Sequence, residues 1–207
     1  MIPSMTPKVV HEFLFDIGTN WSGKGVAMEL GSWLGASSFA LLTGLVKAGY
    51  SLKFWAFDKW IATEYEVLHA KNQSVNISLG ENLRYLYLHN IEKIYDEIIA
   101  IQGKIPQTLK SFPGDPIEIC LFDAPKKDPT FSASIHILEE FFIPGMTVLG
   151  LLDYYSYRKQ TGAKRDRLEA PVRYMSANSD KYEKLAEWPE ECSCVFFKYV
   201  GNALDSE

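Results

Sequence analysis

The chain has 207 residues, of which 47% are hydrophobic and 23% charged, an ordinary composition for a globular protein and enough chain for one domain over 1–207. A net charge of −5, with no basic tract interleaved with aromatic residues, argues against nucleic-acid binding and against an anionic membrane surface. Three cysteines, no signal-peptide pattern and no apolar segment of bilayer length lead us to expect a cytoplasmic protein with reduced thiols and no zinc site.

The predicted elements alternate between helices and strands along the chain. In chain order we expect a helix over 6–16, a strand over 26–30, a helix over 36–48, a strand over 52–57, helices over 62–72 and 83–96, strands over 97–101 and 117–122, a helix over 131–142, a strand over 146–152, a helix over 163–177, and strands over 182–188 and 193–200. Residues 1–24 would then form an N-terminal helix and lid region ahead of a core over 25–200.

This alternation predicts an α/β fold with a doubly wound, mostly parallel seven-stranded sheet that carries helices on both faces. The last two strands are separated only by the short stretch PEEC, so they are expected to form an antiparallel hairpin at one edge. An edge hairpin is a less common addition to such a sheet, and it narrows the field of candidate folds.

Four acidic residues fall at or near the ends of predicted strands, namely Glu29, Asp58, Asp123 and Asp153. In open α/β sheets the ligand lies beyond the carboxyl ends of the strands, where the strand order reverses. Glycines after a strand can serve only to pack a helix, and an Asp ending a strand is often a helix N-cap. The serial order of all these features along one chain nevertheless favours a ligand site.

The turn after the first strand indicates which ligand. Gly31 and Gly35 let the backbone approach a ligand closely, and the small residues that open the next helix, Ser37 among them, leave its amides accessible to a carboxylate. Asp58 can accept both hydroxyls of a ribose, and Glu29 can meet an ammonium group or hold the loop. Trp33 stands where a dinucleotide fingerprint has glycine, so a ribose ligand with a zwitterionic tail and no phosphate fits better.

From Gly25 to Val200 the sequence resembles the class I, Rossmann-like S-adenosylmethionine-dependent methyltransferases. The motifs that carry this resemblance are MELGSWLGASS, AFDKW and ICLFDAP, together with IAIQGKIPQTL, in which Lys104 stands where the family commonly has Asp. The resemblance implies S-adenosylmethionine as cofactor, bound by Glu29, Gly31, Ser32, Gly35, Ser37, Asp58, Lys59, Gly103 and Asp123.

Within this class the chain most resembles the macrocin and catechol O-methyltransferase-like branches, which implies methylation of a hydroxyl on a small molecule such as a sugar or phenol, and a possible homodimer. The branches' divalent cation, Mg²⁺, would lie at Asp123 and Asp153, but Tyr154 follows where the pattern has Asp or Asn and is a poor ligand for a hard cation. The implied catalytic residues are Asp123 and Lys126; the alternative for Lys126 is an ordinary solvated lysine.

Two other hypotheses remain open: a Rossmann-like enzyme that uses another nucleotide, and a methyltransferase-like binding protein that has lost its chemistry. Around the site, Trp33 and Trp60 either border the cofactor or pack in the core. The tyrosines that follow Asp153, at 154, 155 and 157, either wall an acceptor pocket or pack the sheet edge. The four histidines all lie on predicted helices, which favours surface or packing roles.

Overall fold

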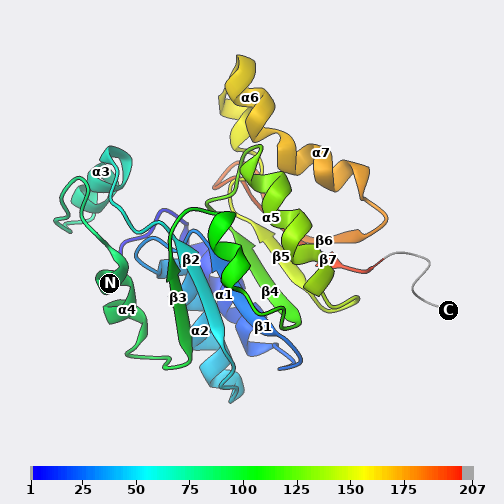
Figure 1. The fold of residues 1–207 in the computed structure, drawn as a ribbon, viewed down its shortest axis with the longest axis horizontal. Helices are drawn as coiled ribbons and strands as arrows, with labels where there is room; N and C mark the ends of the chain where they lie inside the picture. The colour runs from blue at the N-terminus through cyan, green and yellow to red at the C-terminus, as the bar shows by residue number, and fades with distance from the viewer. Residues whose placement is uncertain (1, 202–207) are drawn as a thin grey trace.

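A single mixed sheet organises the computed structural model, which describes residues 2–201 (Figure 1). The strand order is β3-β2-β1-β4-β5-β7-β6, with the first five strands parallel and β7 antiparallel to both of its neighbours. The strands are β1 (Val26–Leu30), β2 (Phe54–Asp58), β3 (Ile98–Gln102), β4 (Ile117–Phe122), β5 (Val148–Leu151), β6 (Tyr182–Trp188) and β7 (Cys194–Tyr199). The predicted doubly wound sheet with a C-terminal hairpin is confirmed.

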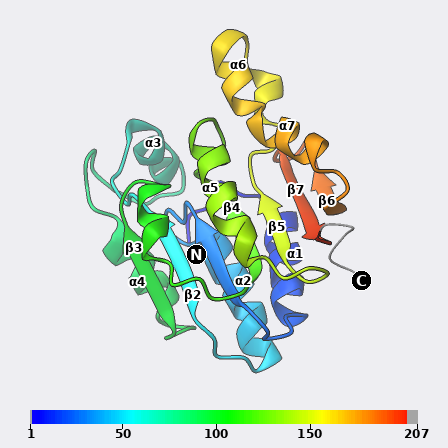
Figure 2. The ribbon, with the colours of Figure 1, turned by 45° about the vertical axis from the view of Figure 1, so that its right-hand side comes forward.

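Helices cover both faces of this sheet, with α5 in front and α1 and α2 behind (Figure 2). The helical elements are α1 (Lys8–Thr19), α2 (Ala36–Ala48), α3 (Glu64–Asn72), α4 (Arg84–Ile91), α5 (Thr130–Leu138), α6 (Gly162–Leu168) and α7 (Ala170–Ala177), with short 3₁₀ turns η1 (Gln107–Ser111), η2 (Glu139–Phe141) and η3 (Ser156–Lys159). Since strand side chains alternate, Phe54 and Ala56 of β2 join one buried cluster, and Trp55 and Phe57 join the other. An inner strand buried on both faces has a continuous apolar run, as β2 does from Phe54 to Phe57.

The N-terminal helix is part of this packed core. Val10 and Leu14 of α1 are fully buried. Two glycines bring α1 and α2 into backbone contact: a Cβ at Gly18 would lie 2.3 Å from the Leu41 carbonyl oxygen, and one at Gly44 would lie 2.2 Å from that of Phe15. The α1 part of the expected lid region therefore belongs to the core.

A buried acid fixes the connection between α1 and β1. Glu118 of β4 is only 6% exposed. Its carboxylate accepts the backbone N–H groups of Ser22, Lys24 and Gly25 at 2.7, 3.0 and 3.2 Å. Hydrogen bonds to a charged acceptor are stronger than those to a neutral one, so Glu118 stabilises the start of β1.

The prediction of one continuous helix over 163–177 is wrong. The structure divides it into α6 and α7, with Pro171 in the first turn of α7. Proline lacks an N–H and its ring clashes with the preceding turn, so it is tolerated at a helix start and ends a helix that reaches it. The predicted helix over 83–96 also stops early, at Ile91, and that over 131–142 ends at Leu138 and continues as η2.

Within residues 2–201, no helix is both long enough and apolar enough to cross a membrane.

Candidate functional site

A cavity of about 810 Å³ opens at the carboxyl ends of the parallel strands. It lies beside β1, which has β2 and β3 on one side and β4 and β5 on the other, so the strand order reverses at this point. Its lining includes Gly31, Trp33, Asp58, Lys59, Gly103, Asp123, Lys126 and Asp153, together with Met5 and Thr6 from the segment before α1. The volume is within the range of cavities that hold small ligands and cofactors.

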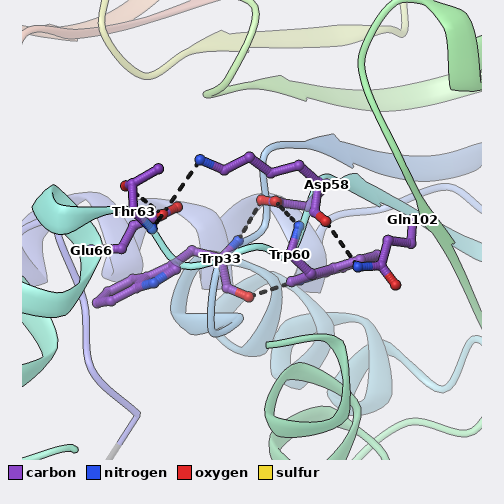
Figure 3. Close-up of polar contacts among 7 residues, drawn as sticks. Trp33, Asp58, Trp60, Thr63, Glu66 and Gln102 are labelled. Atoms are coloured by element: carbon purple, nitrogen blue, oxygen red, sulfur yellow. Dashed lines mark hydrogen bonds and ion pairs between the residues drawn. The ribbon is translucent and has the colours of Figure 1, made fainter. Parts of the chain in front are cut away.

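Asp58, at the end of β2, organises the wall of this cavity (Figure 3). Its two carboxylate oxygens accept the backbone N–H groups of Trp33 at 2.9 Å and Trp60 at 2.7 Å. Both tryptophans have positive φ, +40° and +43°, so the carboxylate holds two unfavourable backbone turns in place. Burial raises the pKa of Asp58, while these backbone hydrogen bonds oppose the shift. Each oxygen can accept a further bond, as a ribose site needs.

The two tryptophans have different surroundings. Trp33 lines the cavity, and its indole N–H is buried without a hydrogen-bond partner among the described residues. Trp60 is 1% exposed and its indole N–H donates to the Trp33 carbonyl at 2.9 Å, so it packs in the core and supports Trp33.

The rim beyond Asp58 is held by polar contacts between β2, β3 and the start of α3 (Figure 3). The side-chain amide of Gln102 donates to the Lys59 carbonyl at 2.9 Å, and the Lys59 ammonium lies 3.4 Å from Glu66. Glu66 in turn accepts from the backbone and hydroxyl of Thr63, a capping box that begins α3. These contacts position Lys59 at the cavity edge.

Glu29 lies behind the cavity and does not line it. It is 1% exposed and accepts a hydrogen bond from the Ser38 hydroxyl of α2, which also lies 3.3 Å from the Tyr87 hydroxyl. Burial raises the pKa of Glu29 to about 8, with Asp123 adding to the rise and the Ser38 hydrogen bond opposing it. Near neutral pH this carboxyl is therefore largely protonated.

The three predicted glycines serve different purposes. Gly31 has φ +100°, and a Cβ there would lie 2.4 Å from the Ala124 backbone nitrogen, so glycine lets the turn meet the end of β4. Gly103 has φ +151° and lines the cavity. Gly35 does not line it: it has φ +91°, and a Cβ there would approach Tyr87 and Ile91 of α4 to 3.0 Å, so this glycine serves the turn and the packing of α4.

Asp123 and Asp153 follow β4 and β5 and lie at the far end of the cavity. The Lys126 ammonium forms an ion pair with Asp153 and also interacts electrostatically with Asp123. Burial raises the pKa of Asp123, Lys126 opposes the rise, and the nearby carboxylates of Asp153 and Asp58 add to it. The two carboxylates together raise the pKa of Lys126 against the effect of burial, so this side chain remains an ammonium.

A second cavity of about 670 Å³ adjoins this end of the first. Tyr65, Ala124, Lys126 and Asp153 line both cavities and form their shared wall. Its remaining lining comes largely from η3 and α6 and includes three further cations, Lys127, Lys164 and Arg167. The arrangement provides two adjoining compartments with an ammonium and a carboxylate between them.

Of the predicted site residues, Gly31, Asp58, Lys59, Gly103, Asp123, Lys126 and Asp153 meet at one cavity. Glu29, Ser32, Gly35 and Ser37 stand behind it. The Ser37 hydroxyl lies 3.4 Å from that of Thr6, so the segment before α1 faces the start of α2. Sequence reasoning did not identify Thr6, Tyr65 or Ile105 as lining residues. Ile105 lies within the IAIQGKIPQTL motif, whereas no motif covers Thr6 or Tyr65.

The structure also decides between the alternative roles of the tyrosines after Asp153 and shows where the four histidines lie. Tyr154 packs edge-on against Tyr155 and Phe197, and Tyr155 donates its hydroxyl to Glu187, so these rings pack the sheet edge. Neither they nor Tyr157 line the two cavities. The four histidines lie on α1, α3, α4 and α5 as predicted, away from both cavities.

Comparison with known proteins identifies the fold. No protein-family model matches the sequence, and no curated protein matches it. Among solved structures, the O-methyltransferase NovP superposes with a TM-score of 0.66 at 15% identity, over 96% of this chain and 83% of that one. The fold is that of the Rossmann-like methyltransferases.

Two further structures give the same result. A putative O-methyltransferase from Klebsiella pneumoniae aligns at 16% identity and a TM-score of 0.65, covering 98% of this chain and 84% of that one. The O-methyltransferase from Bacillus cereus, solved in complex with S-adenosylhomocysteine, aligns at 14% identity and a TM-score of 0.63, covering 95% and 82%. At such low identities the similarity establishes the Rossmann-like methyltransferase fold, as the sequence motifs predicted.

Proposed function

We propose that this protein is an S-adenosylmethionine-dependent methyltransferase that methylates a hydroxyl group of a small molecule. The observation that carries the proposal is the cavity at the strand-order reversal, with Asp58 at one end and Asp123, Lys126 and Asp153 at the other. The methyltransferase fold supports it, as does the S-adenosylhomocysteine complex of the Bacillus cereus enzyme.

The cavity residues fit the chemistry of this cofactor. Asp58 would accept the ribose hydroxyls, and Trp33, which also lines the cavity, would border the cofactor. Gly31 and Gly103 allow the cofactor to lie against the backbone, and Lys59 stands at the rim. Glu29, Ser32, Gly35 and Ser37 would act from behind the cavity by holding the glycine turn and α2 in position.

The acceptor would occupy the second cavity and meet the cofactor at the shared wall. When bound, the cofactor supplies an electrophilic methyl group. In-line transfer mainly needs donor and acceptor to be aligned, and such alignment is worth up to roughly 7–11 kcal/mol. The acceptor hydroxyl must also lose its proton, and the carboxylate of Asp123 or Asp153, which both line the first cavity, would take it. The cations of the second cavity favour an acceptor with a negatively charged group.

The side chains at the ends of β4 and β5 do not fit a divalent cation. Asp153 is already paired with Lys126, and Tyr154 packs its ring against Phe197 and Tyr155. Within residues 2–201 there is no group of three His, Cys, Asp or Glu side chains that could hold a metal ion. These side chains therefore do not supply the set of oxygen ligands that Mg²⁺ needs.

Calorimetric titration with S-adenosylmethionine and S-adenosylhomocysteine tests the proposal. Wild-type protein should bind both, and Asp58→Asn should weaken binding by about ten- to a hundredfold, because a hydrogen bond to a charged group is worth about 1.5–3 kcal/mol. Asp180→Asn, a surface substitution with the same charge change, should leave the affinity unchanged. Absence of heat and of any thermal shift with either ligand would refute the proposal.

Parallel titrations with a nicotinamide dinucleotide and with ATP separate the other hypotheses. Binding of one of these in place of S-adenosylmethionine would indicate an enzyme that uses another nucleotide. Cofactor binding with no methyl transfer to any acceptor class would indicate a binding protein that has lost its chemistry. Three statements stay predictions: residues 1–207 form one domain, the protein pairs as a homodimer, and it resides in the cytoplasm.

A further inference from the structure

The shared wall of the two cavities holds a compact arrangement of two carboxylates and one ammonium. Asp123 and Asp153 come from the ends of neighbouring strands β4 and β5, and Lys126 lies three residues beyond Asp123. The Lys126 ammonium is ion-paired to Asp153 and attracted by Asp123. Its side chain is 42% exposed, and it faces both cavities.

This arrangement occupies the position at which the sequence resemblance predicted a magnesium ion. A hard divalent cation requires about six oxygen ligands, mostly carboxylates, carbonyls and waters. Here one of the two carboxylates already accepts the ammonium, and the phenol of Tyr154 packs at the sheet edge. A divalent cation entering this position would also meet the like charge of Lys126.

We propose that the Lys126 ammonium takes the place of a divalent cation between Asp123 and Asp153, and that the site works without metal. An ammonium has three N–H donors, and Asp153 accepts from one of them. The others are available to the acceptor's oxygen in the second cavity, where Lys126 would bind and orient it as a fixed positive charge. This last role rests on the proposed function, whereas the replacement of the metal does not.

The experiment is a Mn²⁺ titration of the full chain without cofactor or acceptor, followed by electron paramagnetic resonance of the free ion. Wild-type protein should take up no Mn²⁺ at this site. Lys126→Gln removes the competing charge, adds an amide oxygen and leaves both carboxylates, so its Mn²⁺ affinity should exceed that of the wild type by about tenfold or more. Mg²⁺ should likewise raise the melting temperature of this variant alone.

Two controls locate the effect. Lys110→Gln makes the same charge change at an exposed lysine that lines neither cavity and should behave as wild type. Adding Asp153→Asn to Lys126→Gln should abolish the gained binding. The proposal is overturned if wild-type protein binds Mn²⁺ and Asp153→Asn removes that binding, or if Lys126→Gln gains no affinity. Neither result depends on whether S-adenosylmethionine binds, so the proposed function is tested separately.

Discussion

The buried carboxyl of Glu29 predicts how the stability of this protein depends on pH. Glu29 is 1% exposed, and burial raises its pKa from 4.5 to about 8. An unfolded chain returns this group to its ordinary pKa. Replacing Glu29 by glutamine keeps the shape and an oxygen that can accept from Ser38, but removes the titration.

The sign follows from proton counting. Between pH 4.5 and about 8, the folded state keeps the Glu29 proton while the unfolded state has released it, so this residue makes the free energy of unfolding fall as pH rises. The slope is about 1.4 kcal/mol per pH unit, and over the whole interval it amounts to about 5 kcal/mol. The difference in stability between Glu29→Gln and wild type should therefore shift in favour of the variant by about that amount, and level off above pH 8.

Urea unfolding of both proteins at about pH 4, 5, 6, 7, 8 and 9 measures this difference. A constant offset between the two proteins reflects the buried amide that replaces the carboxyl and does not bear on the argument; the diagnostic quantity is the change of the difference with pH. Glu92→Gln, at an exposed position, should differ from wild type by less than about 0.5 kcal/mol throughout. Parallel stability curves for wild type and Glu29→Gln would show that Glu29 is ionised in the folded protein and refute the reasoning.

Two substitutions test the packing that supports the site. Gly44→Ala should lower the free energy of unfolding by about 3 kcal/mol or more, because its Cβ would lie 2.2 Å from the Phe15 carbonyl oxygen. Val46→Ala, on the exposed side of α2, should lower it far less. Equal losses for the two variants in urea unfolding would contradict the close helix contact. Glu118→Gln should lower the free energy of unfolding by about 2–4 kcal/mol, since three backbone N–H groups lose their charged acceptor. The control, Glu97→Gln at an exposed position, should leave the urea midpoint unchanged. An unchanged midpoint for Glu118→Gln as well would show that these hydrogen bonds contribute little.

Local patterns in the sequence predicted the architecture well. Apolar runs such as 26–30 and 117–122 identify buried strands. The glycine-rich turn and the helix that follow the first of them indicate a parallel, doubly wound sheet. Strand-end acids in such a sheet must converge on one edge, so Asp58, Asp123 and Asp153 could be assigned to one site before their geometry was known. Helices and strands depend on residues that are neighbours along the chain, so the spacing of apolar residues indicates them directly.

Side-chain partners could not be obtained in this way. The same E-x-G-x-x-x-G pattern leaves Gly31 at the cavity and places Gly35 against α4, because that difference depends on where α4 packs. Glu29 is equally ambiguous: its position at the end of β1 is evident from the sequence, but its burial against Ser38 appears only when α2 folds back over the strand.

The sequence by itself determined the fold class, the edge of the sheet that carries the site and the acidic residues that line it at the strand ends. Only the tertiary structure decided what those residues do to one another. Lys126 pairs with Asp153 across 27 residues, and Asp58 holds Trp33 across 25, because strand order and register bring them together. Such pairings follow from the spatial adjacency of the strand ends and leave no periodic signal along the chain, so the replacement of a cation by Lys126 becomes visible only in three dimensions.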